Sequence, residues 1–349
     1  MVSQNGCIVA AVAGLKVMAL ARELGRAGQG KETTPLPQNV IELVNNGWKF
    51  PGNTFVVIDS TGSIAVREYL TSLGRKLSGI LMHTVVLGNG TIGLIAIEGA
   101  ERNPNVSDLI ANFWNYVIEN KELQKVLSQP GIARQPIGQG CDSYTMVMPD
   151  SKISLFAASM AERGRQLLQG ESVPKGEILI GHCDNSGLGV QWQNLSISKC
   201  ISIKTGSCPK WEIRIFEEVA NQITDEAKRW GKKETGGVLL GRISLLRHSI
   251  VITRIVEAPP DSKRSEGLFV LGTQGLKQRL RILHKHSCEG LMYVGTWHSH
   301  PQGGKASALD SATLTRLVKL RLGFPAVFLV WTPDEGFLAI MGEGNKISN

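Results

Sequence analysis

Two histidines two positions apart, followed ten positions after the second by an aspartate, form the pattern with the clearest chemical meaning in this 349-residue sequence. The residues are His298, His300 and Asp310. Two neutral imidazoles and one carboxylate suit Zn²⁺, and three protein ligands leave a fourth position for water, as catalytic zinc sites require. Because zinc lowers the pKa of bound water toward neutrality, the pattern predicts a zinc site that hydrolyses a bond.

Two further residues have the chemistry that such a reaction needs. A general base must reach the attacking water without being a metal ligand, and Glu234, just before the apolar run 237–240, is the candidate. Ser307, three residues before Asp310, carries a hydroxyl that could donate to the developing oxyanion. We therefore predict Glu234 and Ser307 as catalytic residues.

The elements around these residues explain how they could meet. Residues 291–297 predict a strand, and because side chains alternate along a strand, His298 and His300 at its end project from the same side. Ser307 is a favourable N-cap for a helix predicted over 307–322, which places the aspartate in the first helical turn. The helix start can thus return the third ligand to the histidines.

The rest of the C-terminal region alternates helices and strands. Residues 216–230 have apolar positions every three or four residues, which predicts an amphipathic helix. A basic helix is predicted over 274–287, and further strands are predicted over 237–240, 250–256, 326–331 and 337–341. This order predicts a mixed α/β layer fold.

Three segments resemble the JAB/MPN metallopeptidases with an intact JAMM motif: ETGGVLLG over 234–241, GTWHSHP over 295–301, and Ser307-x-x-Asp310. The resemblance covers nearly all of residues 211–341 and implies a cytidine-deaminase-like mixed sheet with flanking helices. It also implies Zn²⁺ held by the histidines and the aspartate, the glutamate as acid/base, and the serine as support for the tetrahedral intermediate. The loop before the aspartate is one residue shorter than in many members, but the ligands that noncatalytic MPN proteins typically lose are all present.

The N-terminal half also has α/β patterning, with a strand predicted over 55–58 and helices over 64–73, 106–126 and 153–168. VVIDSTGS over 56–63 and the VREYL that follows resemble the later part of ThiF-type adenylating domains, the fold of ubiquitin-activating enzymes, which implies a partial Rossmann-like region. The earlier glycine-rich turn of those domains is absent, and Gly62 stands where they have a magnesium-binding aspartate. We therefore expect a truncated or degenerate activating domain.

Gly88, Gly90 and Gly93 spell GxGxxG after a predicted strand, which is the fingerprint of dinucleotide binding. That fingerprint needs a helix to open at its third glycine, whereas residues 93–97 predict a second strand and Asn-Gly at 89–90 is a strong hairpin signal. We predict a β-hairpin and no nucleotide site at this position.

Cys141 lies at the end of a Pro/Gly-rich loop, and the ThiF resemblance leaves open a role in thioester transfer. The alternative is a small buried thiol. We favour the alternative because no neighbouring group would clearly lower the pKa of this cysteine.

These patterns divide the chain into four segments, and two domains suit its length. They are an unassigned helix and loop over 1–50, a partial ThiF-like domain over 51–170, a bridging segment over 171–208 and the JAB/MPN domain over 209–349.

Composition argues against several classes of function. The net charge is +8, but the most basic segment, 277–285, repeats its cations every fourth residue, as a solvated helix face does, so we expect no nucleic-acid partner. No stretch approaches the roughly 20 apolar residues that span a bilayer, so we expect no membrane insertion. Six scattered cysteines without a CxxC pair predict reduced thiols and a cytoplasmic location.

Taken with these resemblances, the leading hypothesis is a bacterial zinc-dependent isopeptidase that trims a ubiquitin-like modifier or removes it from conjugates, with a conjugating enzyme as a further partner. Fusions of the two domain types in bacterial conjugation systems, some tied to antiphage defence, suggest that context. The alternatives are a modifier-activating adenylyltransferase, a noncatalytic MPN scaffold, and a small peptidase that releases an amino acid from a carrier protein.

Overall fold

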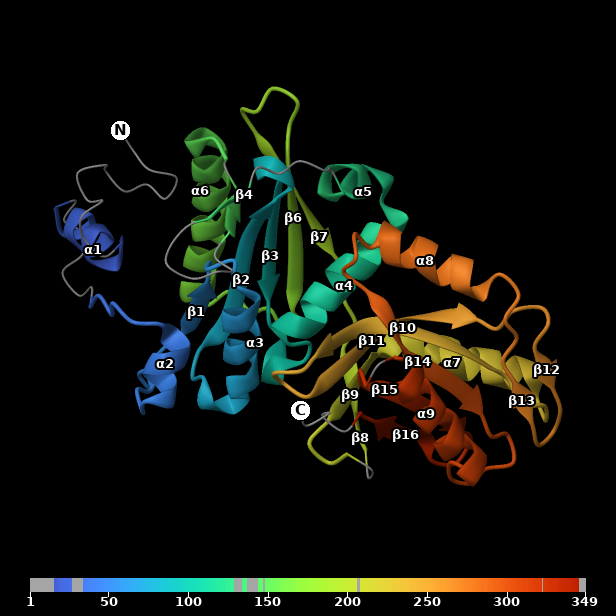
Figure 1. The fold of residues 1–349 in the computed structure, drawn as a ribbon. Helices are drawn as coiled ribbons and strands as arrows, with labels where there is room; N and C mark the ends of the chain where they lie inside the picture. Colours follow the sequence, from blue (N-terminus) through green and yellow to red (C-terminus); the bar gives the residue numbers. More distant parts are fainter. Residues whose placement is uncertain are drawn as a thin grey trace. The chain divides into compact units, whose positions relative to one another are not determined.

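Packing divides the chain into two units, each built on its own sheet (Figure 1). The computed structural model describes residues 16–26, 34–128, 134–136, 144–146, 148–205, 208–321 and 323–344. Unit 1 comprises Met1–Ile97, Val126–Val173 and Glu177–Leu195, and unit 2 comprises Glu98–Lys125, Pro174–Gly176 and Ser196–Asn349.

Unit 1 contains a five-stranded sheet in the order β1-β2-β3-β6-β7. The strands are β1 (Val56–Asp59), β2 (Ile80–Leu87), β3 (Ile92–Ile97), β6 (Glu177–Cys183) and β7 (Val190–Leu195). Helix α3 (Ile64–Leu73) connects the parallel pair β1 and β2, and the other neighbouring strands are antiparallel. Helix α6 (Asp150–Leu168) covers the sheet by packing Phe156 and Met160 into a core with Met82 and Ile95. The single parallel βαβ connection is compatible with a partial Rossmann-like region, and the ThiF-type resemblance stays a prediction.

Short elements complete this half of the chain. They are α1 (Lys16–Arg26), α2 (Val40–Asn45), β4 (Arg134–Pro136) and β5 (Tyr144–Met146). Part of the helix and loop predicted over 1–50, together with Cys141, lies outside the described residues.

The glycine-rich segment after β2 forms the predicted hairpin. Leu87 pairs with Ile92 in an antiparallel register, and Asn89 and Gly90 have positive φ angles of 56° and 79°. No helix opens at Gly93, which lies within β3. The prediction of a turn instead of a dinucleotide fingerprint is therefore confirmed.

Unit 2 contains a seven-stranded mixed sheet in the order β16-β15-β14-β10-β11-β9-β8. The strands are β8 (Cys200–Lys204), β9 (Glu212–Phe216), β10 (Gly236–Ser244), β11 (Ser249–Glu257), β14 (Met292–Ser299), β15 (Ala326–Thr332) and β16 (Gly336–Gly342). Its helices are α4 (Val106–Glu119), α7 (Glu217–Trp230), α8 (Leu276–His286) and α9 (Ala308–Leu320), and β12 (Lys263–Arg264) with β13 (Phe269–Val270) forms a small hairpin. The predicted mixed α/β architecture of this region is confirmed.

Helices α8 and α9 cover the same face of this sheet. Val238 of β10 pairs with Thr296 of β14, which in turn pairs with Phe328 of β15, so the three side chains form one row on one face. Leucines of α8 pack near Val238, and Leu314 of α9 packs near Phe328. The site described below lies on this face.

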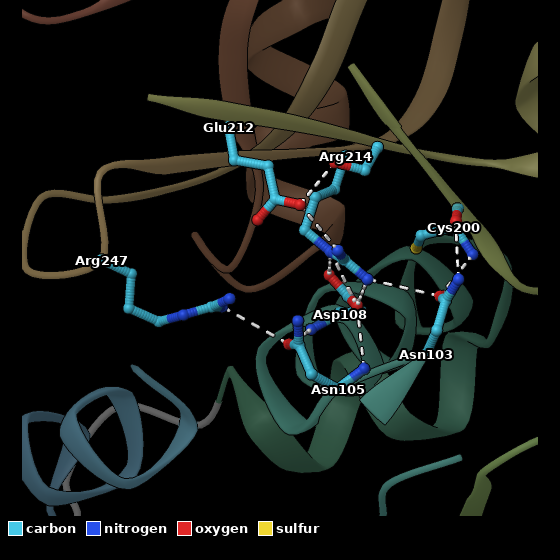
Figure 2. A network of polar contacts seen from close by, with 8 residues as sticks. Asn103, Asn105, Asp108, Cys200, Glu212, Arg214 and Arg247 are labelled. Atoms are coloured by element: carbon cyan, nitrogen blue, oxygen red, sulfur yellow. Dashed lines mark hydrogen bonds and ion pairs between the residues drawn. The ribbon is translucent and has the colours of Figure 1, made fainter. Parts of the chain in front are cut away.

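Residues 98–125 belong to unit 2, although they lie between two strands of unit 1 in the sequence. A buried ion pair holds α4 to β9: Arg214 Nε donates to Asp108 Oδ1 at 2.9 Å and its Nη2 to Asp108 Oδ2 at 2.7 Å (Figure 2). Burial alone would lower the pKa of Arg214, but the Asp108 carboxylate more than offsets this effect and raises it. Asn103 bridges to β8 by accepting from Cys200 N–H at 2.9 Å and donating to its carbonyl at 2.8 Å.

Several predicted boundaries differ from the structure. The run 106–126, predicted as one helix, is broken at Asn120, whose side chain accepts from Leu123 N–H at 3.0 Å and starts α5 (Lys121–Leu127). Strand β9 was not predicted because Arg214 is buried on one of its faces, which hides the usual apolar and polar alternation.

None of the helices in the described residues is both long and apolar enough to cross a membrane.

We predict that Asp108→Asn destabilises the protein by roughly 3 kcal/mol, because the Arg214 guanidinium loses its buried partner and keeps only the partly exposed Glu212 carboxylate. Urea unfolding followed by tryptophan fluorescence would measure the change. Glu162→Gln, which breaks the exposed Glu162–Arg165 pair, is the matched control and should leave the transition unchanged. An equal response of the two variants would show that the Asp108–Arg214 pair has no special role.

Candidate metal centre

The site begins with a backbone clamp between the segments that carry Glu234 and the histidines. Gly236 of β10 pairs with His298 of β14. Beyond this pair, Ser299 N–H donates to the Thr235 carbonyl at 2.7 Å, and Thr235 N–H donates to Ser299 Oγ at 3.0 Å. Thr235 and Ser299 are fully buried, so the clamp is shielded from water. In this register Glu234 comes next to the segment of His300.

His298 and His300 project from the same side of the chain, as predicted. Their ring centroids are 4.5 Å apart, and the His298 ring also packs edge-on against Phe328 at 4.8 Å. His298 is buried, whereas His300 is partly exposed. The pair therefore has one protein-facing imidazole and one imidazole that solvent can reach.

Asp310 reaches both imidazoles from the first turn of α9. Its Oδ1 lies 3.6 Å from His298 Nε2, and its Oδ2 lies 3.8 Å from His300 Nε2. A capping box fixes this position: Ser307 N–H donates to Asp310 Oδ2 at 2.6 Å, and Asp310 N–H donates to Ser307 Oγ at 3.2 Å. The Ser307 hydroxyl accepts in this box, so its own hydrogen is available for another acceptor.

These donor atoms fit a metal ion. His298 Nε2 is buried and has no hydrogen-bond partner among the described residues. Burial lowers the pKa of His298 to about 4, in spite of the nearby Asp310 carboxylate, so the imidazole is in the neutral form that binds metals. Two donors bound tetrahedrally to one Zn²⁺ lie about 3.4 Å apart, close to the 3.6 and 3.8 Å separations seen here.

Glu234 lies close to both histidines, and the three form a group that could hold a metal ion. One ligand-type atom from each of Glu234, His298 and His300 lies within 4.8 Å of the other two. Burial raises the pKa of Glu234, and the Asp310 charge adds to this effect, while His300 opposes it. The Phe269 N–H donates to the Glu234 carboxylate, and the Glu234 N–H donates to the Ser265 carbonyl at 2.8 Å. A carboxylate with a raised pKa beside a hydrolytic centre suits proton transfer.

Sequence reasoning missed the residues that hold Glu234 in place. Arg264 of β12 donates from Nε to Thr235 Oγ1 at 3.2 Å, and its guanidinium lies 4.2 Å from the centroid of the Trp230 ring. Gly236 is required by close approach, because a Cβ there would lie 2.5 Å from Phe269 Cε1 and 2.3 Å from the Trp297 carbonyl oxygen. The Gly-Gly after Glu234-Thr235 was the signal in the sequence that could have indicated this crowding.

The structure thus brings together all five residues that the sequence singled out. Glu234, His298, His300, Ser307 and Asp310 come from three segments of unit 2, and the shorter loop before the aspartate does not keep it from the histidines. The arrangement can hold a divalent metal, present a carboxyl group to a water, and offer a hydroxyl near the helix start.

Known proteins are similar to the part of the chain that contains this site. Residues 216–342 match the family described as prokaryotic homologs of the JAB domain. The "CD-NTase/cGAS isopeptidase" of Enterobacter hormaechei subsp. hoffmannii (strain UCI 50) is 34% identical over 100 residues, which are 29% of this chain and 54% of that protein. The "Probable metalloprotease y4qB" of Sinorhizobium fredii (strain NBRC 101917 / NGR234) is 28% identical over 131 residues, or 36% of this chain and 79% of that protein. The match to the isopeptidase spans about half of its length.

We predict about one zinc ion per chain in the wild-type protein and none in a His298→Ala/His300→Ala double variant, because the loss of two ligands leaves only carboxylates. Elemental analysis of protein purified without a metal-binding tag would measure both. His286→Ala on the exposed face of α8 is the control and should keep the metal. Zinc retained by the first variant would contradict the assignment.

The metal-free protein should lose stability as the pH falls from about 6.5 to 4. The pKa of His298 is about 4 in the folded chain and near 6.5 unfolded, so the unfolded state binds the extra proton in this window. The expected loss is on the order of 1–3 kcal/mol. Urea unfolding at pH 7, 6 and 5 would measure it, and His298→Gln should flatten the dependence. An equal slope in both proteins would assign the effect to other groups.

Proposed function

We propose that unit 2 is a JAMM-type zinc peptidase that cleaves a peptide or isopeptide bond at the C-terminal tail of a ubiquitin-like modifier. The observation that carries this proposal is the approach of the Asp310 carboxylate to both His298 and His300 Nε2 atoms, with Glu234 close to both histidines. The buried Nε2 atom of His298 has no hydrogen-bond partner among the described residues, which is unfavourable unless it binds a ligand. A noncatalytic scaffold would gain nothing from this arrangement.

In the proposed site, His298, His300 and Asp310 hold Zn²⁺. The bound ion would supply Lewis acidity and lower the pKa of the attacking water. Glu234 takes the proton from that water and passes it to the leaving amine, which its raised pKa favours. The Ser307 hydroxyl donates to the oxyanion.

The proposed substrate class is based on the similarity of this chain to the two relatives. Both relatives have names that denote proteases, and one of them is named as an isopeptidase in a CD-NTase/cGAS context. The JAB-type match includes every residue of the proposed site. We therefore propose a modifier or its conjugates as the substrate, in a cytoplasmic conjugation system with a conjugating enzyme as a further partner.

Glu234→Gln should keep zinc but lose cleavage by about 100-fold or more, because the amide cannot accept the proton of the water. Two probes would be used: quenched-fluorescence peptides, and ubiquitin joined through its C-terminus to the ε-amine of a fluorescent lysine peptide. The wild-type rate should rise with pH through a pKa above the usual value for glutamate, since burial raises the pKa of Glu234.

Glu218→Gln, an exposed change on α7, is the matched control and should behave as wild type. Full activity of Glu234→Gln would overturn the proposed role of this residue. Loss of zinc from the same variant would make Glu234 a ligand and not a base.

A further inference from the structure

A cavity of about 520 Å³ adjoins the proposed metal centre and includes His298 and Asp310 in its lining. Its floor is the row of paired side chains Val238, Thr296 and Phe328. Binding pockets for small molecules and peptide side chains usually have volumes of this order. The cavity is therefore large enough for more than a single small side chain.

The walls of the cavity are apolar and come from the two helices that cover this face of the sheet. Leu276 and Leu280 project from α8, and Leu309 and Leu317 project from α9. Burial also raises the pKa of Tyr293, another lining residue, to about 12, as expected next to apolar neighbours. Apolar walls bind aliphatic groups and exclude charged ones.

The rim of the cavity exposes large apolar side chains. Leu268, Val270 and Leu309 belong to the lining, yet they are 45%, 44% and 61% exposed. They come from the β12–β13 hairpin and from the start of α9, next to Asp310. Exposed apolar side chains that gather at the mouth of a cavity indicate that an apolar ligand covers them.

One polar group on the floor has no partner. Thr296 is only 8% exposed, and its Oγ1 atom has no hydrogen-bond partner among the described residues. Thr296 lies two residues before His298 on the same face of β14. A buried hydroxyl left unpaired is unfavourable, so a polar atom of the ligand would satisfy it.

We propose that this cavity is a specificity pocket for a large aliphatic side chain of a substrate residue next to the cleaved bond, with the Thr296 hydroxyl bonded to the substrate backbone. The inference rests on the proposed peptidase function. Glycine on both sides of the bond would leave the apolar walls uncovered. The preferred substrates therefore carry leucine or a similar residue at one of these two positions.

The test uses quenched-fluorescence peptides that differ only at the two positions flanking the bond, with glycine, leucine or lysine at each. Leucine at one position should raise kcat/KM about 10- to 100-fold over glycine, because the pocket gains a buried aliphatic group. Thr296→Val should lower kcat/KM for the leucine peptide about 2- to 10-fold. Thr296→Leu, which adds bulk to the floor, should reduce the preference of leucine over glycine.

A second readout does not depend on turnover. The inactive Glu234→Gln protein should bind the leucine peptide more tightly than the glycine peptide in isothermal titration calorimetry. Thr296→Val should not lower the melting temperature of the free protein, since the hydroxyl has no internal partner to lose. Thr315→Val on the exposed side of α9 is the matched control and should change neither peptide preference nor binding.

The outcomes separate this inference from the proposed function. If no peptide and no ubiquitin probe is cleaved by zinc-loaded protein, the proposed function fails. If cleavage depends on zinc and Glu234 but glycine is preferred at both positions, the specificity pocket is refuted and the peptidase stands. A lower melting temperature for Thr296→Val would assign the hydroxyl a structural role instead.

Discussion

The geometry of the site depends on the two hydrogen bonds between Thr235 and Ser299, one between backbone groups and one from the Thr235 N–H to the Ser299 hydroxyl. They extend the β10–β14 ladder past its last regular pair, so the segment with the glutamate and the segment with the histidines end side by side. A shift of one residue in this register would turn the imidazoles to the other face of the sheet. The clamp is buried, and Arg264 supports it from the β12–β13 hairpin. Through Arg264, the hairpin and Trp230 thus help to fix the position of Glu234.

The third ligand depends on a different constraint, which is the start of a helix. Asp310 serves at once as the N3 residue of a capping box and as a carboxylate aimed at two imidazoles. The partial positive charge of the helix N-terminus attracts a carboxylate at this position. Metal binding and the formation of the first turn of α9 therefore stabilise the same side-chain position. This double use explains how the loop between His300 and α9 delivers the aspartate to both histidines.

Much of the site could be predicted from sequence because its signals are local. Two histidines at strand spacing, and an aspartate three residues after a capping serine, define their own directions through the periods of strand and helix. The rest depended on contacts between distant segments. Strand β9 was hidden by the buried Arg214, whose partner Asp108 lies 106 residues away. The apolar cavity depends on how α8 and α9 are spaced over one face of the sheet. No single segment of the sequence encodes this spacing, so the position of Thr296 in the cavity could not be predicted.

The passage of residues 98–125 into unit 2 also bears on how such a chain could have arisen. The chain passes from one unit to the other five times, after Ile97, Lys125, Val173, Gly176 and Leu195. A single genetic breakpoint near residue 209 would transfer the JAB-like region without α4 and β8, and would separate the buried Arg214 from the Asp108 carboxylate. Recombination at a single breakpoint therefore cannot exchange one unit without breaking the other. Residues 98–125 and the rest of unit 2 are expected to have diverged together, with changes at Asp108 compensated at Arg214.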